Sequence, residues 1–217
     1  MSIARRLERR LEGLLDGMVG LVARGPLQPV EFASRLVREA DLASTETEAG
    51  PAVPNRFFVA VNPDDLPAEM PVGDYTAAVA EVVAGSIAER GWRTEGPVRV
   101  ELRGDESVAR GSLACRSEVS PGVLTPWARL LGTGVFEVGH NRAIVGRSDA
   151  CDVVIPDPRV SRRHAVVWRR DGHARIRDLG SSNGTAVDGL AVGPDPVDLE
   201  DGSVLSLGGV AFRFEEI

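Results

Sequence analysis

The sequence contains no lysine: all 25 of its basic side chains are arginines, set against 32 aspartates and glutamates. This absence excludes every mechanism that needs a lysine amine, including Schiff-base catalysis and nucleotide binding by a phosphate loop. The formal net charge of −7 also argues against non-specific nucleic-acid binding, which depends on neutralising many phosphates at once. We therefore expect no nucleic-acid partner.

Long hydrophobic runs and cysteines are equally scarce. No stretch approaches the 18 apolar residues that a transmembrane helix needs, and Asp16 interrupts the apolar part of the basic N-terminus, so no signal peptide is indicated. Cys115 and Cys151 lack metal-ligand spacing and are expected to be small buried side chains. His140 and His173 lie in predicted turns and are expected at the surface. The sequence thus predicts a cytoplasmic protein with no metal site and no cofactor.

The chain divides into two halves with different patterns. Its 217 residues suit one large or two small domains. In the first half, apolar spacing predicts helices over residues 3–24, from Pro29 onward, and from about Asp74 to Arg90, and strands at 56–61, 98–103 and 109–116. The acidic stretch 41–54 is expected to be a loop. We therefore predict a small α/β domain over residues 1–117, with three helices on a short three-stranded sheet.

Beyond residue 117 the helical periodicity disappears. Residues 118–126 are predicted to form a short linker, because their Pro, Gly and Ser content is typical of loops. Residues 127–217 contain short alternating segments, cut by four dipeptides typical of tight turns: Asp171-Gly172, Asp188-Gly189, Asp201-Gly202 and Gly208-Gly209. This pattern predicts an all-β sandwich, so the expected fold class is α+β multidomain.

One group of side chains in the second half suits the capture of an anion. Arg147 and Arg162 can make charge-assisted hydrogen bonds to phosphate oxygens, and Ser161 and Ser182 add hydroxyl donors. Asn183 can pair with a peptide backbone, because its amide is both donor and acceptor. These residues lie in three predicted loops, and loops cluster at the ends of a sandwich. We therefore predict that the five residues share one surface.

The motifs around these residues closely resemble those of a forkhead-associated (FHA) domain, a β-sandwich that reads phosphothreonine. The resemblance covers residues 127–217 and runs through the segments 145–148, 152–155, 160–165, 178–185 and 187–189. It implies that Arg147 and Ser161 bind the phosphate, that Arg162 and Ser182 help, and that Asn183 holds the peptide main chain beyond the phosphothreonine. It also implies three residues that support the binding loop: Gly146, His164 and Gly184.

The first half carries a second resemblance. Residues 5–17, 28–31, 38–41 and 53–57 are similar to an actinobacterial domain of poorly defined function, which typically precedes an FHA domain in FhaA-like proteins. This resemblance covers residues 1–117. It implies a role in Ser/Thr kinase signalling at the cell envelope.

Together these patterns predict a protein-binding adaptor, not an enzyme. The resemblances imply a partner phosphorylated on threonine, either a kinase or a kinase substrate, in cell-wall growth or division, and recruitment of the adaptor to the inner face of the membrane. Ser161, His164 and Asp178 invite a hydrolase interpretation, but no nucleophile elbow accompanies them and a Ser-x-x-His pair has a structural explanation. The alternative is a nucleic-acid-binding or membrane-associated regulator that uses the N-terminal domain.

Two hypotheses concern the N-terminal half. The leucine stripe of residues 3–24 offers a surface for self-association or peripheral membrane attachment, and packing within its own domain is the simpler interpretation. Thr45 and Thr47 lie in an acidic stretch and are candidate phosphorylation sites. An FHA domain would read the resulting phosphothreonine in cis or in trans, and the alternative is plain solvated linker.

Overall fold

The computed structural model describes residues 29–67 and 70–217, which form two compact units. One unit comprises the described residues up to Thr45 together with 52–87 and 94–122. The other comprises 46–51, 88–93 and 123–217. The helix expected over residues 3–24, with its roles in self-association and membrane attachment, lies outside the described residues. No helix of the described part is long and apolar enough to cross a membrane.

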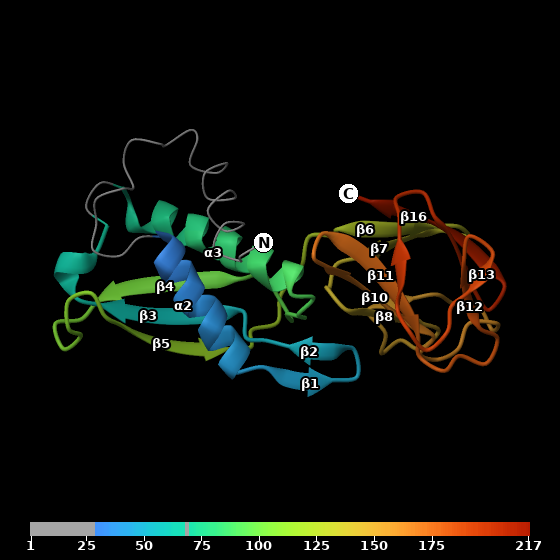
Figure 1. Ribbon diagram of the computed structural model, residues 1–217, viewed down its shortest axis with the longest axis horizontal. Coiled ribbons are helices and arrows are strands. Elements are labelled where there is room, and N and C mark those ends of the chain that lie inside the picture. Colours follow the sequence, from blue (N-terminus) through green and yellow to red (C-terminus); the bar gives the residue numbers. More distant parts are fainter. Residues whose placement is uncertain (1–28, 68–69) are drawn as a thin grey trace. The chain divides into compact units, whose positions relative to one another are not determined.

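The first unit is built on a three-stranded sheet with β3 (Arg56–Val61) at its centre. Strand β4 (Arg99–Gly104) pairs with β3 in parallel, and β5 (Leu113–Glu118) pairs with it antiparallel. Helices α2 (Pro29–Leu42) and α3 (Val72–Glu89) and the short 3-10 helix η1 (Pro63–Asp65) are the other elements (Figure 1). The described residues therefore hold three strands and two α-helices here, where three helices are predicted.

The N-terminus of α3 differs from its prediction. The amide of Tyr75 donates to the carbonyl of Pro71 at 3.1 Å, and this bond closes a first turn that includes Asp74. The helix therefore starts at Val72, two residues before the predicted start, and Asp74 lies in its first turn. A carboxylate in the first turn is still favourable, because it interacts with the positive end of the helix dipole.

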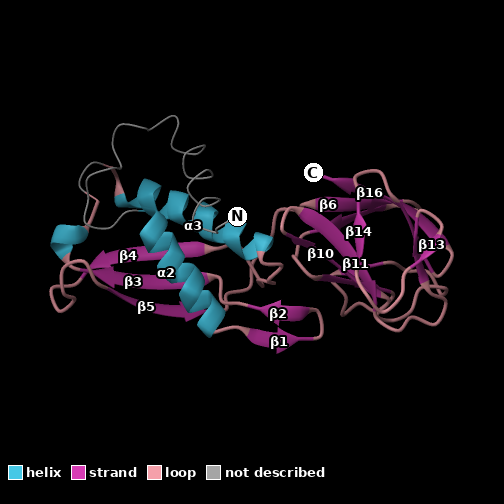
Figure 2. Ribbon diagram, in the orientation of Figure 1, coloured by secondary structure: helices cyan, strands magenta, loops and turns pink. Residues whose placement is uncertain are grey.

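Alternation along β3 and two helical faces supply the core of the first unit. Phe57, Val59 and Val61 are almost completely buried, and α2 crosses the sheet (Figure 2). Phe32 of α2 meets Tyr75 of α3 edge to face, with ring centroids 5.7 Å apart. Burial raises the pKa of Tyr75 to about 12, so its hydroxyl stays neutral in the core.

A buried asparagine ties together three segments of the first unit. Asn55 is 1% exposed, and its side-chain amide donates to the carbonyls of Pro97 at 3.0 Å and Ser120 at 2.9 Å. Its side-chain carbonyl accepts the amide of Ser120 at 2.9 Å. This one side chain therefore fixes the start of β3 against the segments that precede β4 and follow β5.

The second unit contains the predicted sandwich of two sheets. One sheet has the order β14-β11-β10-β8-β9 and the other the order β13-β12-β15-β16-β6-β7. The first sheet consists of β8 (Ala143–Gly146), β9 (Val153–Val154), β10 (Ala165–Arg170), β11 (His173–Asp178) and β14 (Val197–Leu199). The second consists of β6 (Ala128–Leu131), β7 (Val135–Val138), β12 (Thr185–Val187), β13 (Leu190–Ala191), β15 (Val204–Leu207) and β16 (Val210–Glu216).

The core of the sandwich consists of apolar side chains from both sheets. It includes Val145 and Ile176 from one sheet and Leu205 and Phe212 from the other, all almost fully buried. The three tryptophans of the chain are also buried. Of the two cysteines, Cys151 is buried as predicted, whereas Cys115 is only half-buried because it lies on an edge strand.

Three of the four predicted turn dipeptides make two-residue hairpins. Asp171-Gly172 joins β10 to β11, Asp188-Gly189 joins β12 to β13, and Gly208-Gly209 joins β15 to β16. Both residues of each dipeptide have positive φ, the conformation that a type I′ turn requires. Asp201-Gly202 differs, because β14 and β15 on either side of it pair within different sheets. That turn carries the chain from one sheet to the other.

The prediction of a loop over residues 41–54 is wrong. Helix α2 continues to Leu42, and β1 (Thr45–Thr47) then pairs with β2 (Gly50–Ala52). The Thr47 hydroxyl donates to the carbonyl of Gly50 at 2.7 Å, and Gly50 adopts a φ of 115°. Beta-branched threonines favour extended backbone, and glycine permits the turn, so these local preferences outweigh the acidic composition.

Two segments from the first half of the chain belong to the second unit, residues 46–51 and 88–93. Arg93 in the second of these segments makes two hydrogen bonds of 2.8 Å to the carboxylate of Asp152, and the two side chains are 12% and 14% exposed. His140 Nδ1 lies 3.2 Å from the same carboxylate, and its side chain is half-buried. His140 is therefore only partly exposed, because its ring contacts Asp152, whereas His173 is exposed as expected.

Replacing Asn55 by alanine tests the role of the buried asparagine. Asn55→Ala leaves two partly buried carbonyls and one amide without their partner, so we expect a loss of about 1–3 kcal/mol in the free energy of unfolding. The measurement is urea denaturation followed by circular dichroism. Ser112→Ala, which truncates an exposed polar side chain of the same unit, is the matched control, and equal stability of the two variants would contradict the assignment.

Candidate functional site

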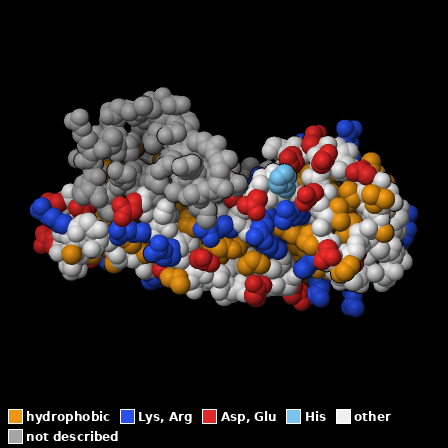
Figure 3. Space-filling model, in the orientation of Figure 1, with side chains coloured by type: hydrophobic (Ala, Val, Ile, Leu, Met, Phe, Trp, Pro, Cys, Tyr) orange, Lys and Arg blue, Asp and Glu red, His pale blue; other side chains and the backbone are white. Residues whose placement is uncertain are grey.

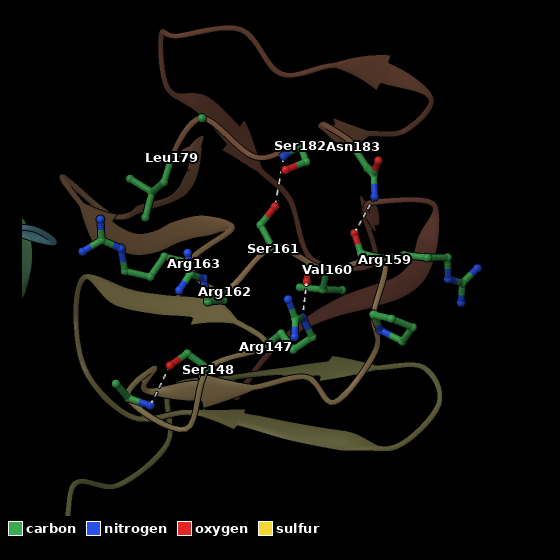
Figure 4. Close-up of a pocket in the computed structure, with 13 residues that line it drawn as sticks. Arg147, Ser148, Arg159, Val160, Ser161, Arg162, Arg163, Leu179, Ser182 and Asn183 are labelled. Carbon is green, nitrogen blue, oxygen red and sulfur yellow. Dashed lines mark hydrogen bonds between the residues drawn. The ribbon is translucent and has the colours of Figure 1, made fainter.

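Three loops at one edge of the first sheet of the sandwich enclose a pocket of about 560 Å³ (Figure 4). Because β10 runs antiparallel to both β8 and β11, the end of β8, the start of β10 and the end of β11 meet at this edge. The lining residues are Arg147, Ser148, Ala150, Pro158, Arg159, Val160, Ser161, Arg162, Arg163, Leu179, Gly180, Ser182 and Asn183. The structure thus brings together all five residues for which a shared surface is predicted.

The loop that precedes β10 holds both the backbone and the guanidinium of Arg147. Its backbone amide donates to the carbonyl of Ser161 at 2.9 Å, and its Nε donates to the carbonyl of Val160 at 3.1 Å. The second contact uses one of the five N–H donors of the guanidinium. The contact at Nε orients the planar group, which can bind two oxygens of one phosphate through its other nitrogens.

Ser161 occupies the middle of the pocket in Figure 4, and its hydroxyl is oriented by the loop that follows β11. The backbone amide of Ser182 donates to Ser161 Oγ at 3.0 Å. Because this bond uses a lone pair of the oxygen, the hydroxyl proton is left to donate to another acceptor. An anion in the pocket is such an acceptor.

His164 is completely buried and connects the loop that precedes β10 with the loop that follows β11. Its Nδ1 accepts the backbone N–H of Ser161 at 3.0 Å, so this nitrogen carries no proton. Its Nε2 lies 3.1 Å from the carbonyl of Gly184 and, in that tautomer, donates to it. Burial lowers the pKa of His164, although the hydrogen bond to the Gly184 carbonyl opposes this effect. The lowered pKa favours the neutral ring.

Two glycines allow the close approach that this arrangement requires. A Cβ on Gly146 would collide with the backbone carbonyl of Arg162, so only glycine lets β8 pass beneath the binding loop. Gly184 adopts a φ of 76°, a conformation that other residues rarely take, and so presents its carbonyl to His164. The two supporting glycines expected from the sequence therefore have a structural explanation.

Asp178 organises the loop that follows β11, a role that the sequence interpretation missed. Its carboxylate accepts the amides of Gly180 and Ser181 at 2.8 and 2.7 Å, and the hydroxyls of Ser181 and Thr185, both at 2.6 Å. Burial alone would raise the pKa of Asp178, but these hydrogen bonds hold the pKa below its ordinary value. The spacing of polar residues after Asp178 is the signal that could have indicated this loop.

Asn183 is exposed and contacts the loop between β9 and β10. Its Nδ2 donates to the carbonyl of Arg159 at 2.8 Å, which leaves the side-chain oxygen to accept a further hydrogen bond. The same Arg159 carries a guanidinium held by Asp157 at 3.0 and 2.8 Å. These contacts lower the pKa of Asp157 to about 2.

The sequence interpretation missed two arginines of the pocket. Arg159 and Arg163 line it beside the predicted Arg147 and Arg162. Arg163 forms an ion pair with Glu48. The signal available in the sequence was the local excess of arginine over acidic residues, nine against four between residues 142 and 177.

Thr45 and Thr47, the candidate phosphorylation sites, both lie exposed on β1, and neither lines this pocket. A search of residues 29–67 and 70–217 finds no group of three or more His, Cys, Asp or Glu that could hold a metal ion.

Comparison with protein families gives two matches. Residues 4–116 match the family described as FhaA, N-terminal domain, and residues 143–208 match the FHA domain. The first match covers slightly more than half of the chain.

Individual relatives are similar over part of the chain only. The ABC transporter ATP-binding/permease protein Rv1747 of Mycobacterium tuberculosis is 38% identical over 84 residues, 39% of this chain and 9% of the relative. The FHA domain-containing protein FhaB of Mycolicibacterium smegmatis is 34% identical over 82 residues, 36% of this chain and 52% of the relative. This chain thus spans less than a tenth of the first relative and about half of the second.

A solved structure is also similar over part of the chain. It is a crystal structure of the FhaA FHA domain complexed with the intracellular domain of Rv3910. It shares 30% sequence identity with this chain, covers 42% of this chain and 100% of its own, and gives a TM-score of 0.36.

The family assignment follows from the match over residues 4–116, which covers more than half of the chain. The chain belongs to the FhaA N-terminal domain family, and it carries an FHA domain after that region.

Proposed function

We propose that this chain is a phosphothreonine-dependent adaptor that binds a threonine-phosphorylated protein in bacterial Ser/Thr kinase signalling. The observation that carries the proposal is the pairing of Arg147 and Ser161 in one pocket, each oriented by backbone groups of a neighbouring loop. The FHA match over residues 143–208 supports it independently.

The proposed mechanism follows from the donors of the pocket. A phosphothreonine carries about −1.5 to −2 charges at neutral pH and three strong acceptor oxygens. Arg147 would bind two of these oxygens, and the Ser161 hydroxyl would donate to the phosphate, with help from Arg162 and Ser182. Asn183 would hold the peptide main chain through its free side-chain oxygen. Gly146, His164 and Gly184 would act only through the geometry of the loops.

We propose no catalytic activity for this site. Both ring nitrogens of His164 bond to backbone groups, Nδ1 to the Ser161 amide and Nε2 to the Gly184 carbonyl. A general base for the Ser161 hydroxyl would instead have to face Oγ. The ring is therefore aligned for support of the loops.

The face shown in Figure 3 suits a protein partner better than an extended nucleic acid. Among the described residues of that face, arginines and acidic side chains are interspersed, with no large area of positive charge alone. Binding to a polyanion depends on such an area, whereas a single phosphate needs only a few placed donors.

We further propose the cellular setting and the domain boundaries. The adaptor would act in the cytoplasm and be recruited to the inner face of the membrane by a kinase or kinase substrate, in cell-wall growth or division. Its domains would be residues 1–117 and 127–217, joined by the linker 118–126. Thr45 and Thr47 stay predictions as phosphorylation sites.

Replacing Arg147 by alanine tests the phosphate contact. Hydrogen bonds to a charged group contribute about 1.5–3 kcal/mol each, so Arg147→Ala should weaken binding of a phosphothreonine peptide about 10- to 100-fold. Calorimetry with matched phosphothreonine, phosphoserine and unmodified peptides is the measurement. Arg129→Ala, on β6 and outside the pocket, is the matched control. Equal binding of the three peptides by the unaltered chain would rule out the proposed function.

A second prediction concerns the pH dependence of stability. The pKa of His164 is lower in the folded chain than its unfolded value of about 6.5. The unfolded chain therefore binds a proton more readily, so the stability due to the neutral ring is complete above about pH 6.5 and declines as the pH falls below it. His164→Ala should lose about 1–3 kcal/mol at pH 7.5 and clearly less at pH 5.

Thermal unfolding of the ligand-free protein at both pH values measures this difference. His173→Ala, which removes an exposed histidine of the same sheet, should behave like the unaltered chain at both. A stability loss of His164→Ala that did not change with pH would show that the ring is not held neutral.

A further inference from the structure

The pocket contains four arginines, and two of them have carboxylate partners in the protein. Asp157 holds Arg159 from within the same loop, through hydrogen bonds of 3.0 and 2.8 Å. Arg163 pairs with Glu48, which lies in the turn between β1 and β2. The charge on the Arg163 side of the pocket is therefore set by a residue outside the FHA match.

Contacts within the second unit hold Glu48 in this place. Ala49, the next residue, is 2% exposed and packs with Val166 and Trp168. Arg142 donates to the carbonyl of Ala49 at 3.2 Å, and its guanidinium lies 5.0 Å from the centre of the Trp168 ring. Because Ala49 is held through both its side chain and its carbonyl, the adjacent Glu48 is positioned next to the pocket.

We propose that Glu48 is a specificity-determining residue of the phosphopeptide site, an inference that rests on the proposed function. Its carboxylate neutralises Arg163 and selects against phosphothreonine peptides with an acidic residue or a second phosphate on the flank that meets Arg163. Such a peptide must displace Glu48 from Arg163 or lie beside an uncompensated carboxylate. Specificity arises here from an unfavourable interaction with the wrong peptide.

The geometry of the pocket limits the effect to one flank of the peptide. In Figure 4, Arg163 and Asn183 lie on opposite sides of Ser161. Asn183 is the residue proposed to hold the main chain beyond the phosphothreonine. The flank that Glu48 controls is therefore the one on the N-terminal side of the phosphothreonine, and residues on the C-terminal side should be insensitive to Glu48.

Exposure of the pair sets the expected magnitude. The side chains of Arg163 and Glu48 are 55% and 65% exposed, and ion pairs of this kind contribute modestly because water screens them. Removing the carboxylate should therefore tighten binding of the acid-flanked peptide about two- to five-fold. A peptide with neutral flanks should bind unchanged.

Calorimetry on the full chain tests the proposal with Glu48→Gln and three synthetic phosphothreonine peptides: neutral flanks, two glutamates before the phosphothreonine, and two glutamates after it. The expected result is tighter binding of the second peptide only. Glu46→Gln is the matched control, because it removes the same charge from the same hairpin but has no ion pair with the pocket. The thermal midpoint of each variant checks that it is folded.

A double-mutant cycle with Arg163→Gln identifies the route of the effect. If Glu48 acts through Arg163, Glu48→Gln should have no effect on the acid-flanked peptide when Arg163 is already replaced. Equal affinities of Glu48→Gln and the unaltered chain for all three peptides, with phosphothreonine dependence intact, would overturn this inference alone. If the unaltered chain instead bound phosphothreonine and unmodified peptides equally well, the proposed function would be overturned, and this inference with it.

Discussion

The geometry of the candidate site depends on one buried histidine, His164. His164 can accept the Ser161 amide at Nδ1 only while that nitrogen is unprotonated, and the proton on Nε2 is then given to the Gly184 carbonyl. These backbone groups belong to different loops, and the loops carry Ser161 and Ser182, which also bond to each other. Protonation of Nδ1 would break the bond to the Ser161 amide, and the relative position of the two loops depends on that bond. The neutral state of the ring and the position of the Ser161 and Ser182 hydroxyls are therefore coupled.

The same site resolves an apparent conflict between an acidic chain and an anionic ligand. The net charge of −7 is unevenly distributed: residues 142–177 hold nine arginines and four acids, whereas residues 178–217 hold one arginine and eight acids. Two arginines of the basic segment that line the pocket are paired with carboxylates, Arg159 with Asp157 and Arg163 with Glu48. Part of the positive charge of the pocket is therefore neutralised within the protein. Guanidinium suits phosphate binding, because its planar donors match two oxygens of a phosphate.

The sequence predicts the parts of this structure that depend on local preferences. The hairpin at Asp171-Gly172 follows from its two residues, and the five ligand-binding candidates share one pocket because strand order brings their loops to one edge. The turn at Asp201-Gly202 has the same local signal, but its neighbouring strands find partners in different sheets, which only tertiary packing decides. The contact between Glu48 and Arg163 likewise depends on packing between segments that are distant in the sequence.

The compact units do not follow the family matches, and this has a physical consequence for the sandwich. Arg93 lies within the residues matched by the FhaA N-terminal domain, yet it belongs to the second unit and bonds the Asp152 carboxylate there. Burial alone would raise the pKa of Asp152, and the bonds from Arg93 and the Ile144 amide hold the pKa below its ordinary value. Without Arg93, a carboxylate that is 14% exposed would lose its main partner, and breaking one half of such a pair is costly. Residues 46–51 and 88–93 therefore contribute to the second unit both the partner of a largely buried carboxylate and the carboxylate that pairs with Arg163 of the pocket.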